Sequence, residues 1–287
     1  MNTKHRRTGL RVAALLAALT VGAAAQLVAT APAAAVSGLF RTTHLATATN
    51  SQSPKFRAAE CPGDTRVIGG GARVTGPAAG SIRLSALQPV SGPGQTDRYE
   101  VWADEPPGGV SGNWALEGYA ICAPANSVPG YTIVPGNSTY SSSSTRSTAA
   151  GCSGSQRVIG TGASVTGGGF GNVGLQMSRA SGPLDIARAA AAEDGAYSGN
   201  WRVTAYAICA NPVGAAAEGS VQTGVASANH TCSSSTEDVH SVGAATGPGA
   251  SGQTFLSSLY PNAGLSTVNL TLTGVPTDGL AIQAICA

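Results

Sequence analysis

The chain has 287 residues, of which 42% are hydrophobic and only 10% are charged, and it contains 39 glycines and six cysteines. This composition favours short strands joined by tight turns over helices. The formal net charge of +2 becomes −2 when the first 35 residues, with four basic and no acidic side chains, are set aside. That balance argues against a nucleic-acid partner.

Residues 1–35 have the order of a secretory signal peptide: a basic start, an apolar run and then small residues. Ala33 and Ala35 satisfy the small-x-small rule for cleavage before Val36. The Arg6-Arg7 pair leaves twin-arginine export open beside the Sec route. No later segment offers about 18 consecutive apolar residues, so we expect a secreted protein without a membrane anchor after cleavage.

Two phrases recur along the rest of the chain. CPGDTRVIGGGARVTG at 61–76 aligns without a gap with CSGSQRVIGTGASVTG at 152–167, and SGNWALEGYAICA at 111–123 matches SGNWRVTAYAICA at 198–210. A third, degenerate copy starts at Cys232 and ends in LAIQAICA at 287. The predicted organisation is a lead-in segment 36–60, repeat units 61–123, 152–210 and 232–287, a Ser-rich spacer or edge strand 124–151, and a spacer 211–231.

The six cysteines all follow the predicted signal peptide, and an even number in an exported protein indicates disulfides. Spacing alone leaves fifteen pairings open. Each repeat unit, however, begins and ends on a cysteine. Repetition therefore predicts the pairs Cys61–Cys122, Cys152–Cys209 and Cys232–Cys286.

Alternation within the repeated phrases predicts about four strands in each unit, at 67–74, 81–89, 98–104 and 113–123 in the first. In the second unit the alanine-rich segment 186–192 is equally compatible with a short helix. Trp114 and Trp201 share strand parity with the closing cysteines, so we predict that both lie in the core. The segments before each opening cysteine resemble one another and are predicted to form a fifth, edge strand.

Gly69-Gly70-Gly71 is predicted to mark a bulge or a crowded crossing of backbones. A phosphate-binding loop is disfavoured, because neither a helix signal nor a GK[ST] sequence follows. The expected fold is all-β, with three internal repeats of four or five antiparallel strands, each closed by a disulfide. Two arrangements remain open, a β-prism-like one and tandem small sandwiches.

CPGDTRVIGGGA with GYAICA, and CSGSQRVIGTGA with AYAICA, resemble a group of exported actinobacterial proteins with the repeat C-P-x-G-x-x-V-x-G-G-G-A and an A-Y-A-I-C-A-like close. The resemblance spans residues 61–287 and implies no activity. The third unit departs from it with Asp278 at the tryptophan position and Gln283 in place of the tyrosine. Three β units are also similar in architecture to the β-prisms of jacalin-type lectins and vitelline membrane outer-layer protein.

Few residues favour catalysis. His44, His230 and His240 are the histidines after residue 35, and we interpret them as solvated, because no GxSxG context supports a Ser-His-Asp site. The acidic spots Asp104-Glu105 with Glu117, and Glu193-Asp194, adjoin turn sequences and are expected to face water rather than form a glycosidase pair. Asp97 and Asp104 are candidate calcium ligands, although the sequence contains no EF-type loop. We therefore expect no enzyme activity, cofactor or metal.

Aromatic residues are the candidate binding groups. Tyr119 and Tyr206 lie on the strand face opposite the cysteines and are the preferred surface candidates, with Trp102 and Tyr99 beside them. The sequence thus favours a secreted, non-enzymatic module that binds a cell-surface or extracellular polysaccharide or another envelope component. The alternative is a structural or protein-binding extracellular protein, including an enzyme inhibitor.

Overall fold

The computed structural model describes residues 36–167, 171–211, 214–249 and 252–287. The predicted signal peptide lies outside these ranges. Within them the secondary structure is almost entirely β, which confirms the predicted class, and the two helical segments are the short 3₁₀ turns η1 (Ala79–Ser81) and η2 (Ala125–Ser127). The described residues belong to one compact unit.

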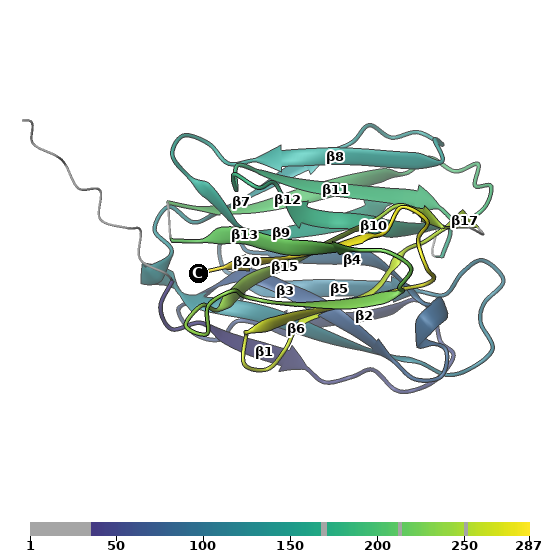
Figure 1. Ribbon diagram of the computed structural model, residues 1–287, viewed down its shortest axis with the longest axis horizontal. Helices are drawn as coiled ribbons and strands as arrows, with labels where there is room; N and C mark the ends of the chain where they lie inside the picture. The colour runs from purple at the N-terminus through teal and green to yellow at the C-terminus, as the bar shows by residue number, and fades with distance from the viewer. Residues whose placement is uncertain (1–35, 168–170, 212–213, 250–251) are drawn as a thin grey trace, which may run out of the picture. The chain divides into compact units, whose positions relative to one another are not determined.

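Three antiparallel sheets of six strands each make up the fold (Figure 1). Sheet I has the order β1 (Phe40–His44), β6 (Ala115–Pro124), β3 (Thr65–Thr75), β18 (Leu256–Pro261), β19 (Thr267–Leu272) and β14 (Ser227–Thr231). Sheet II has the order β2 (Lys55–Glu60), β5 (Arg98–Asp104), β4 (Arg83–Val90), β9 (Arg157–Thr166), β12 (Arg202–Ala210) and β7 (Thr132–Asn137). Sheet III has the order β13 (Ala216–Gln222), β20 (Leu280–Cys286), β15 (Val239–Thr246), β10 (Val173–Ala180), β11 (Ile186–Glu193) and β8 (Thr145–Gly151). A separate two-stranded ribbon pairs β16 (Pro248–Gly249) with β17 (Gly252–Gln253).

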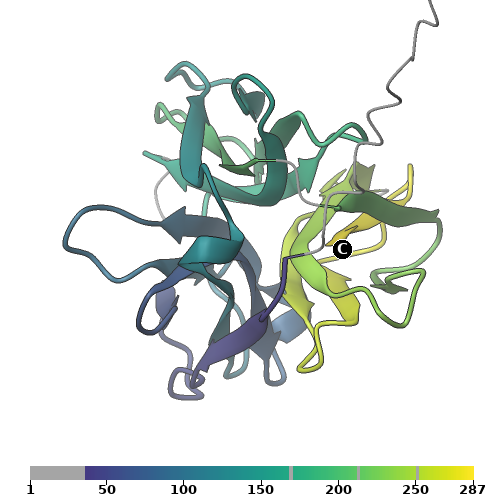
Figure 2. The same cartoon turned by 90° about the vertical axis from the view of Figure 1, so that its left-hand side faces the viewer.

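Every large sheet is shared by two repeats. The first repeat supplies β1, β6 and β3 to sheet I and β2, β5 and β4 to sheet II, and the other two repeats divide their strands in the same way. Figure 2 shows the three repeats, coloured from purple to yellow, gathered around a common centre. Tandem sandwiches would keep each repeat's strands in its own sheets, so the shared sheets match the prism-like arrangement.

The segments before the opening cysteines form strands β2, β8 and β14, and each lies at the edge of a sheet as predicted. Each repeat also has a further edge strand, β1, β7 or β13, which the sequence did not indicate. The ambiguous alanine-rich segment is strand β11 rather than a helix. The end of the Ser-rich spacer is likewise ordered, because it pairs as β8 with β11.

The predicted disulfides are confirmed: Cys61–Cys122, Cys152–Cys209 and Cys232–Cys286 are all bonded, with Cα atoms 5.6, 5.7 and 5.8 Å apart. Each bond joins the segment between the second and third strands of a repeat to its last strand. By closing a long loop, each can stabilise the fold by about 4 kcal/mol in the chain-entropy model.

A bulge and a crowded crossing of backbones, the two features predicted for the glycine-rich segment, both occur there. The register of β3 against β6 shifts at Ile68, and equivalent bulges occur at Ile159 and His240. A Cβ atom on Gly69 would clash with the carbonyl oxygen of His240, and one on Gly160 with that of Ile68. Strands β3, β9 and β15 therefore approach one another so closely that only glycine fits at these two positions.

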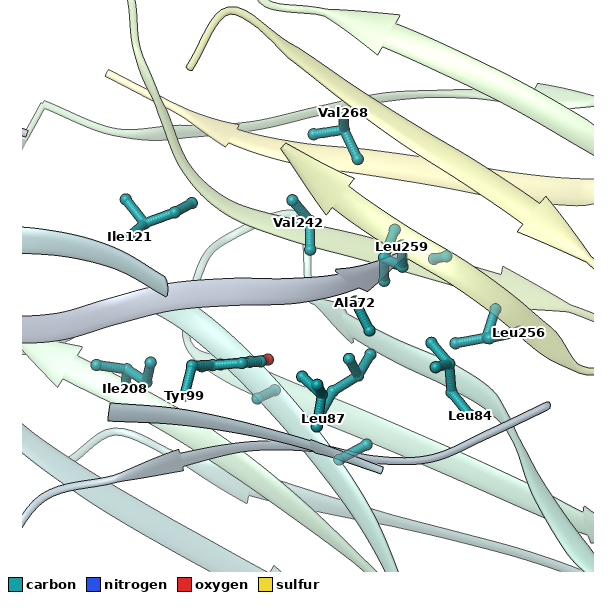
Figure 3. Packing of buried hydrophobic residues seen from close by; sticks show 14 of the residues in the cluster. Ala72, Leu84, Leu87, Tyr99, Ile121, Ile208, Val242, Leu256, Leu259 and Val268 are labelled. Atoms are coloured by element: carbon teal, nitrogen blue, oxygen red, sulfur yellow. The ribbon is translucent and has the colours of Figure 1, made fainter. Parts of the chain in front are cut away.

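The core around this crossing draws on all three repeats. Figure 3 shows Leu87, Ile208 and Leu259, one from each repeat, in the same packed cluster. All three side chains are at most 1% exposed. One core therefore joins the three repeats.

Candidate functional site

A groove of about 450 Å³ opens on the outer face of sheet II. Its walls come from β4, β5 and β9, with contributions from Gly167 and from the start of β10. Trp102 supplies an aromatic ring, Gln88 an amide, and Ser85 and Ser164 two hydroxyl groups. Strands from the first and second repeats thus combine to form one site.

Strand register explains the hollow. Ala86 in β4 lies directly opposite Trp102 of β5 on one side and Ser164 of β9 on the other. Its methyl group is much smaller than the flanking indole, so the surface is lowered between the two neighbours. Ala86, Trp102 and Ser164 therefore form the floor and sides of the groove.

Asp104 lies at one end of the groove and is only 1% exposed. Burial raises the pKa of its carboxyl group to about 6, although Ser85 and the Arg83 guanidinium act in the opposite direction. Arg83 is itself paired with Asp194, at 2.6 Å between Nη1 and Oδ2. Both oxygens of Asp104 are shielded from solvent, so this carboxyl group does not offer an open contact to a ligand.

Tyr206 contacts Ser164, one of the residues that line the groove on sheet II. Its hydroxyl lies 3.1 Å from Ser164 Oγ, and burial raises the pKa of the phenol. The side chain is half-buried, so its ring is only partly available to a ligand. Trp102 is also partly exposed, and unlike Tyr206 it is one of the residues that line the groove.

Tyr119 does not offer the exposed surface that strand parity indicated. It is 4% exposed: its ring stacks on Tyr260 at 5.6 Å between centroids, and Arg41 lies 4.6 Å above it. Its hydroxyl donates to Glu117. Tyr260 belongs to the third repeat, so Tyr119 joins two repeats within sheet I.

Gln283 has the same register position in sheet III and a comparable role. Its side-chain amide accepts from the backbone N–H of Ala180 at 2.8 Å and donates to the carbonyl oxygen of the same residue at 3.1 Å. Ala180 belongs to the second repeat. Tyr119 and Gln283, which share one position of the repeated phrase, therefore each contact a neighbouring repeat.

Tyr99 is a core residue, which corrects its assignment as a binding residue. It is 1% exposed, and its hydroxyl donates to the carbonyl oxygen of Thr161 at 2.9 Å. A Cβ atom on Gly70 would clash with its ring. The strand that carries Tyr99 alternates, so Trp102 faces outward while Tyr99 packs inward against the second repeat.

The acidic side chains expected to face water have structural partners. Trp114 Nε1 donates to Glu105 at 2.8 Å, and Trp201 Nε1 donates to Glu193 at 2.9 Å. Both tryptophans are fully buried, which confirms their predicted place in the core. Each carboxylate therefore satisfies an indole N–H and is not free to pair with another acid.

A cationic side chain also lies over the ring of each buried tryptophan. Lys55 Nζ lies 4.6 Å from the centroid of the Trp114 ring, and the Arg146 guanidinium lies 5.7 Å from that of Trp201. We call each set a tryptophan clamp: Lys55, Trp114 and Glu105 in the first repeat, and Arg146, Trp201 and Glu193 in the second. A glutamate precedes each of the two SGNW phrases, Glu105 in the first repeat and Glu193 in the second. This repeated glutamate is the sequence signal that could have predicted its hydrogen bond to the tryptophan.

The histidines differ from one another in environment. His44 is exposed and His230 lies 3.8 Å from Glu218, whereas His240 is fully buried at the central crossing. Neither ring nitrogen of His240 has a hydrogen-bond partner among the described residues, and burial lowers its pKa to about 4. The expectation of a solvated histidine is therefore wrong at this position, because β15 runs through the core.

Among the described residues, no group of three or more His, Cys, Asp or Glu side chains is placed to hold a metal ion. Asp97 instead accepts from the backbone N–H of Val67 and pairs with Arg66 at 3.5 Å. Within the same ranges, no helix has the length and apolarity needed to span a membrane. No protein-family model matches the chain, and a search of curated proteins found no relative.

Proposed function

We propose that this protein is a secreted, non-enzymatic module that binds a cell-surface or extracellular polysaccharide through the groove on sheet II. The observation that carries the proposal is the partly exposed Trp102 beside the side chains of Gln88, Ser85 and Ser164. An aromatic face can stack on a sugar ring, while amide and hydroxyl groups exchange hydrogen bonds with sugar hydroxyls.

The other two outer sheet faces support this choice of site. At the position of Gln88, sheet I has Tyr260, which is stacked on Tyr119, and sheet III has Arg179. At the position of Trp102, these sheets have Thr271 and Ala190. Only sheet II combines an accessible indole with polar groups around a hollow in the described residues.

Three observations support the remaining parts of the proposal. Three disulfides are typical of proteins that fold in an oxidising, extracellular compartment. Glu105 and Glu193 are committed to buried indoles, and the Asp104 oxygens are shielded. The carboxylates near the groove are thus poorly placed for the pair of accessible acids that glycoside hydrolysis requires.

The test is depletion of the purified, oxidised 36–287 fragment from solution by insoluble cell walls, peptidoglycan, chitin and cellulose. Saturable binding to one matrix, competed by its soluble fragments, is the expected result. Trp102→Ala and Gln88→Ala should weaken it about tenfold or more, as for central contacts of an interface. Arg179→Ala, at the Gln88 position of sheet III, is the matched control and should bind normally.

Intrinsic fluorescence gives an independent reading, because Trp114 and Trp201 are fully buried while Trp102 lines the groove. Soluble fragments of the bound matrix should change the emission of the unmodified protein and leave that of Trp102→Ala unchanged. Failure on every matrix would contradict the proposal. Binding that survives Trp102→Ala in full would place the site elsewhere.

A further inference from the structure

A second groove, of about 410 Å³, lies where the edges of sheets I and II meet. One wall is the end of β1, with Thr42, Thr43 and His44. The other wall is β2, from Phe56 to Glu60. Among the residues that the structure describes, neither strand has a further partner strand on this side, because β1 and β2 are the edge strands of their sheets.

The two grooves meet at one aromatic pair. Phe56 lines the second groove and is 37% exposed, and Trp102 lines the first. Their ring centroids are 4.7 Å apart with the planes tilted by 41°. Because Phe56 and Trp102 are cross-strand partners in β2 and β5, the pair forms a ridge between adjacent hollows.

The second groove, like the first, combines an aromatic ring with polar side chains. Thr43 and Glu60 are exposed and supply a hydroxyl and a carboxylate, while Phe56 supplies a ring face. Arg57 is not available to a ligand in the same way, since its guanidinium donates to the carbonyl oxygens of Leu45 and Phe56 at 2.8 and 3.0 Å.

We propose that the two grooves are subsites of one binding track across the Phe56–Trp102 ridge, and that the ligand is an extended polysaccharide chain rather than a single terminal sugar. A polymer presents the same ring faces and hydroxyl groups at successive units, so it can fill both hollows at once. The inference rests on the proposed function and adds to it the length of ligand recognised. Binding in the second groove then becomes intramolecular once the first is filled, which raises affinity without any change in the first.

The experiment uses chitin- and cellulose-derived oligosaccharides, from disaccharide to hexasaccharide, titrated calorimetrically into the 36–287 fragment. Affinity should rise by about tenfold between the shortest fragment that binds and those long enough to cross the ridge. The double variant Thr43→Ala with Glu60→Ala should remove this gain and leave short-fragment affinity unchanged, and Phe56→Ala should remove the gain as well. Ser227→Ala, at the Phe56 position of sheet I, is the matched control.

The double variant separates the track from indirect effects of Phe56 on Trp102, because Thr43 and Glu60 line only the second groove. Equal affinity for short and long fragments would overturn the track while leaving the proposed function intact. A length dependence that the second-groove variants do not alter would overturn it as well. If no fragment and no insoluble matrix binds, the proposed function fails and the track fails with it.

Discussion

The first two repeats each hold a buried tryptophan between a cation and a carboxylate, whereas the third repeat has none of the three residues. At the clamp positions of the third repeat stand Ala226, Gly274 and an exposed Asp278. The loss of all three clamp residues together, rather than of one, has a physical reason. A glutamate buried without its indole donor, or a lysine buried without its carboxylate, would carry an uncompensated desolvation cost.

The clamps and the groove on sheet II use different tryptophans. The tryptophans of both clamps are fully buried, and the residues that line the groove on sheet II include Trp102 but no clamp residue. Of the three tryptophans in the chain, two are therefore buried in the core, and the third, Trp102, lines the groove that we propose as the binding site. Mutations at the equivalent positions of different repeats can test this division.

The largest expected effect is the loss of a clamp tryptophan. Trp114→Ala or Trp201→Ala should lower the free energy of unfolding by about 4 kcal/mol, because each removes a fully buried indole and leaves a cavity. Asp278→Ala, at the same position of the third repeat, should change it by less than about 0.5 kcal/mol. Urea unfolding at neutral pH measures all three, and similar losses in the three repeats would contradict the distinction.

The central crossing gives a second contrast between repeats. His240 occupies the bulge position held by Ile68 and Ile159, and burial lowers its pKa from 6.5 to about 4. Between these values the unfolded chain binds a proton that the folded protein excludes. The His240 contribution to stability is therefore complete above pH 6.5 and falls as the pH drops, by about 3 kcal/mol at pH 4.

His240→Ile should remove this acid sensitivity and give the third repeat the residue of the other two. The difference in unfolding free energy between the variant and the unmodified protein should grow as the pH falls from 6.5 to 4. Urea unfolding at four or more pH values across that window provides the measurement. A constant difference across the window would show that His240 is protonated equally in both states.

Asp104 should have the opposite pH dependence. Its pKa is raised from 3.8 to about 6, so between these values the folded protein holds a proton that the unfolded chain releases, and stability falls as the pH rises. Asp104→Asn should therefore stabilise the protein at pH 7 by up to about 3 kcal/mol. The second repeat has buried Ala192 at this position.

Because the His240 and Asp104 contributions have opposite signs between about pH 4 and 6, they largely cancel in the unmodified protein. In Asp104→Asn only the His240 effect remains, so the free energy of unfolding should fall as the pH drops from 6 to 4. In His240→Ile only the Asp104 effect remains, so the free energy of unfolding should rise over the same range. A parallel pH titration of both variants by thermal unfolding checks this. An Asp104→Asn variant that is less stable than the parent at pH 7 would contradict the assignment.

The features that could be predicted from the sequence are those that repeat within a short stretch. Gapless copies of the Cys61 and Cys122 phrases fixed the disulfide partners, and alternation in the NW…YAICA phrase placed Trp114 in the core. Clustered glycines with no helix signal indicated the crowded crossing at Gly69. In each case the deciding information was local, or was repeated at the same spacing.

The remaining features depend on which repeat lies beside which. Alternation placed Tyr119 on the face opposite Cys122, but only the third repeat, through Tyr260, determines that this face is covered. The groove has the same origin: Ala86 and Ser164 come from different repeats and meet as strand partners. No spacing in the sequence links such pairs, because the sharing of sheets between repeats is a tertiary property.

The smallest expected effect concerns the carboxylates of the clamps. Glu105→Gln and Glu193→Gln keep a side-chain oxygen that can accept from the indole Nε1 but remove its charge, so each should cost about 1 kcal/mol. Glu105→Gln should cost the more of the two, because it leaves Lys55, 5% exposed, without the carboxylate that raises its pKa against the effect of burial. Urea unfolding of the two variants at pH 7 makes the comparison. An equal or larger loss for Glu193→Gln would contradict the effect assigned to the Glu105–Lys55 interaction.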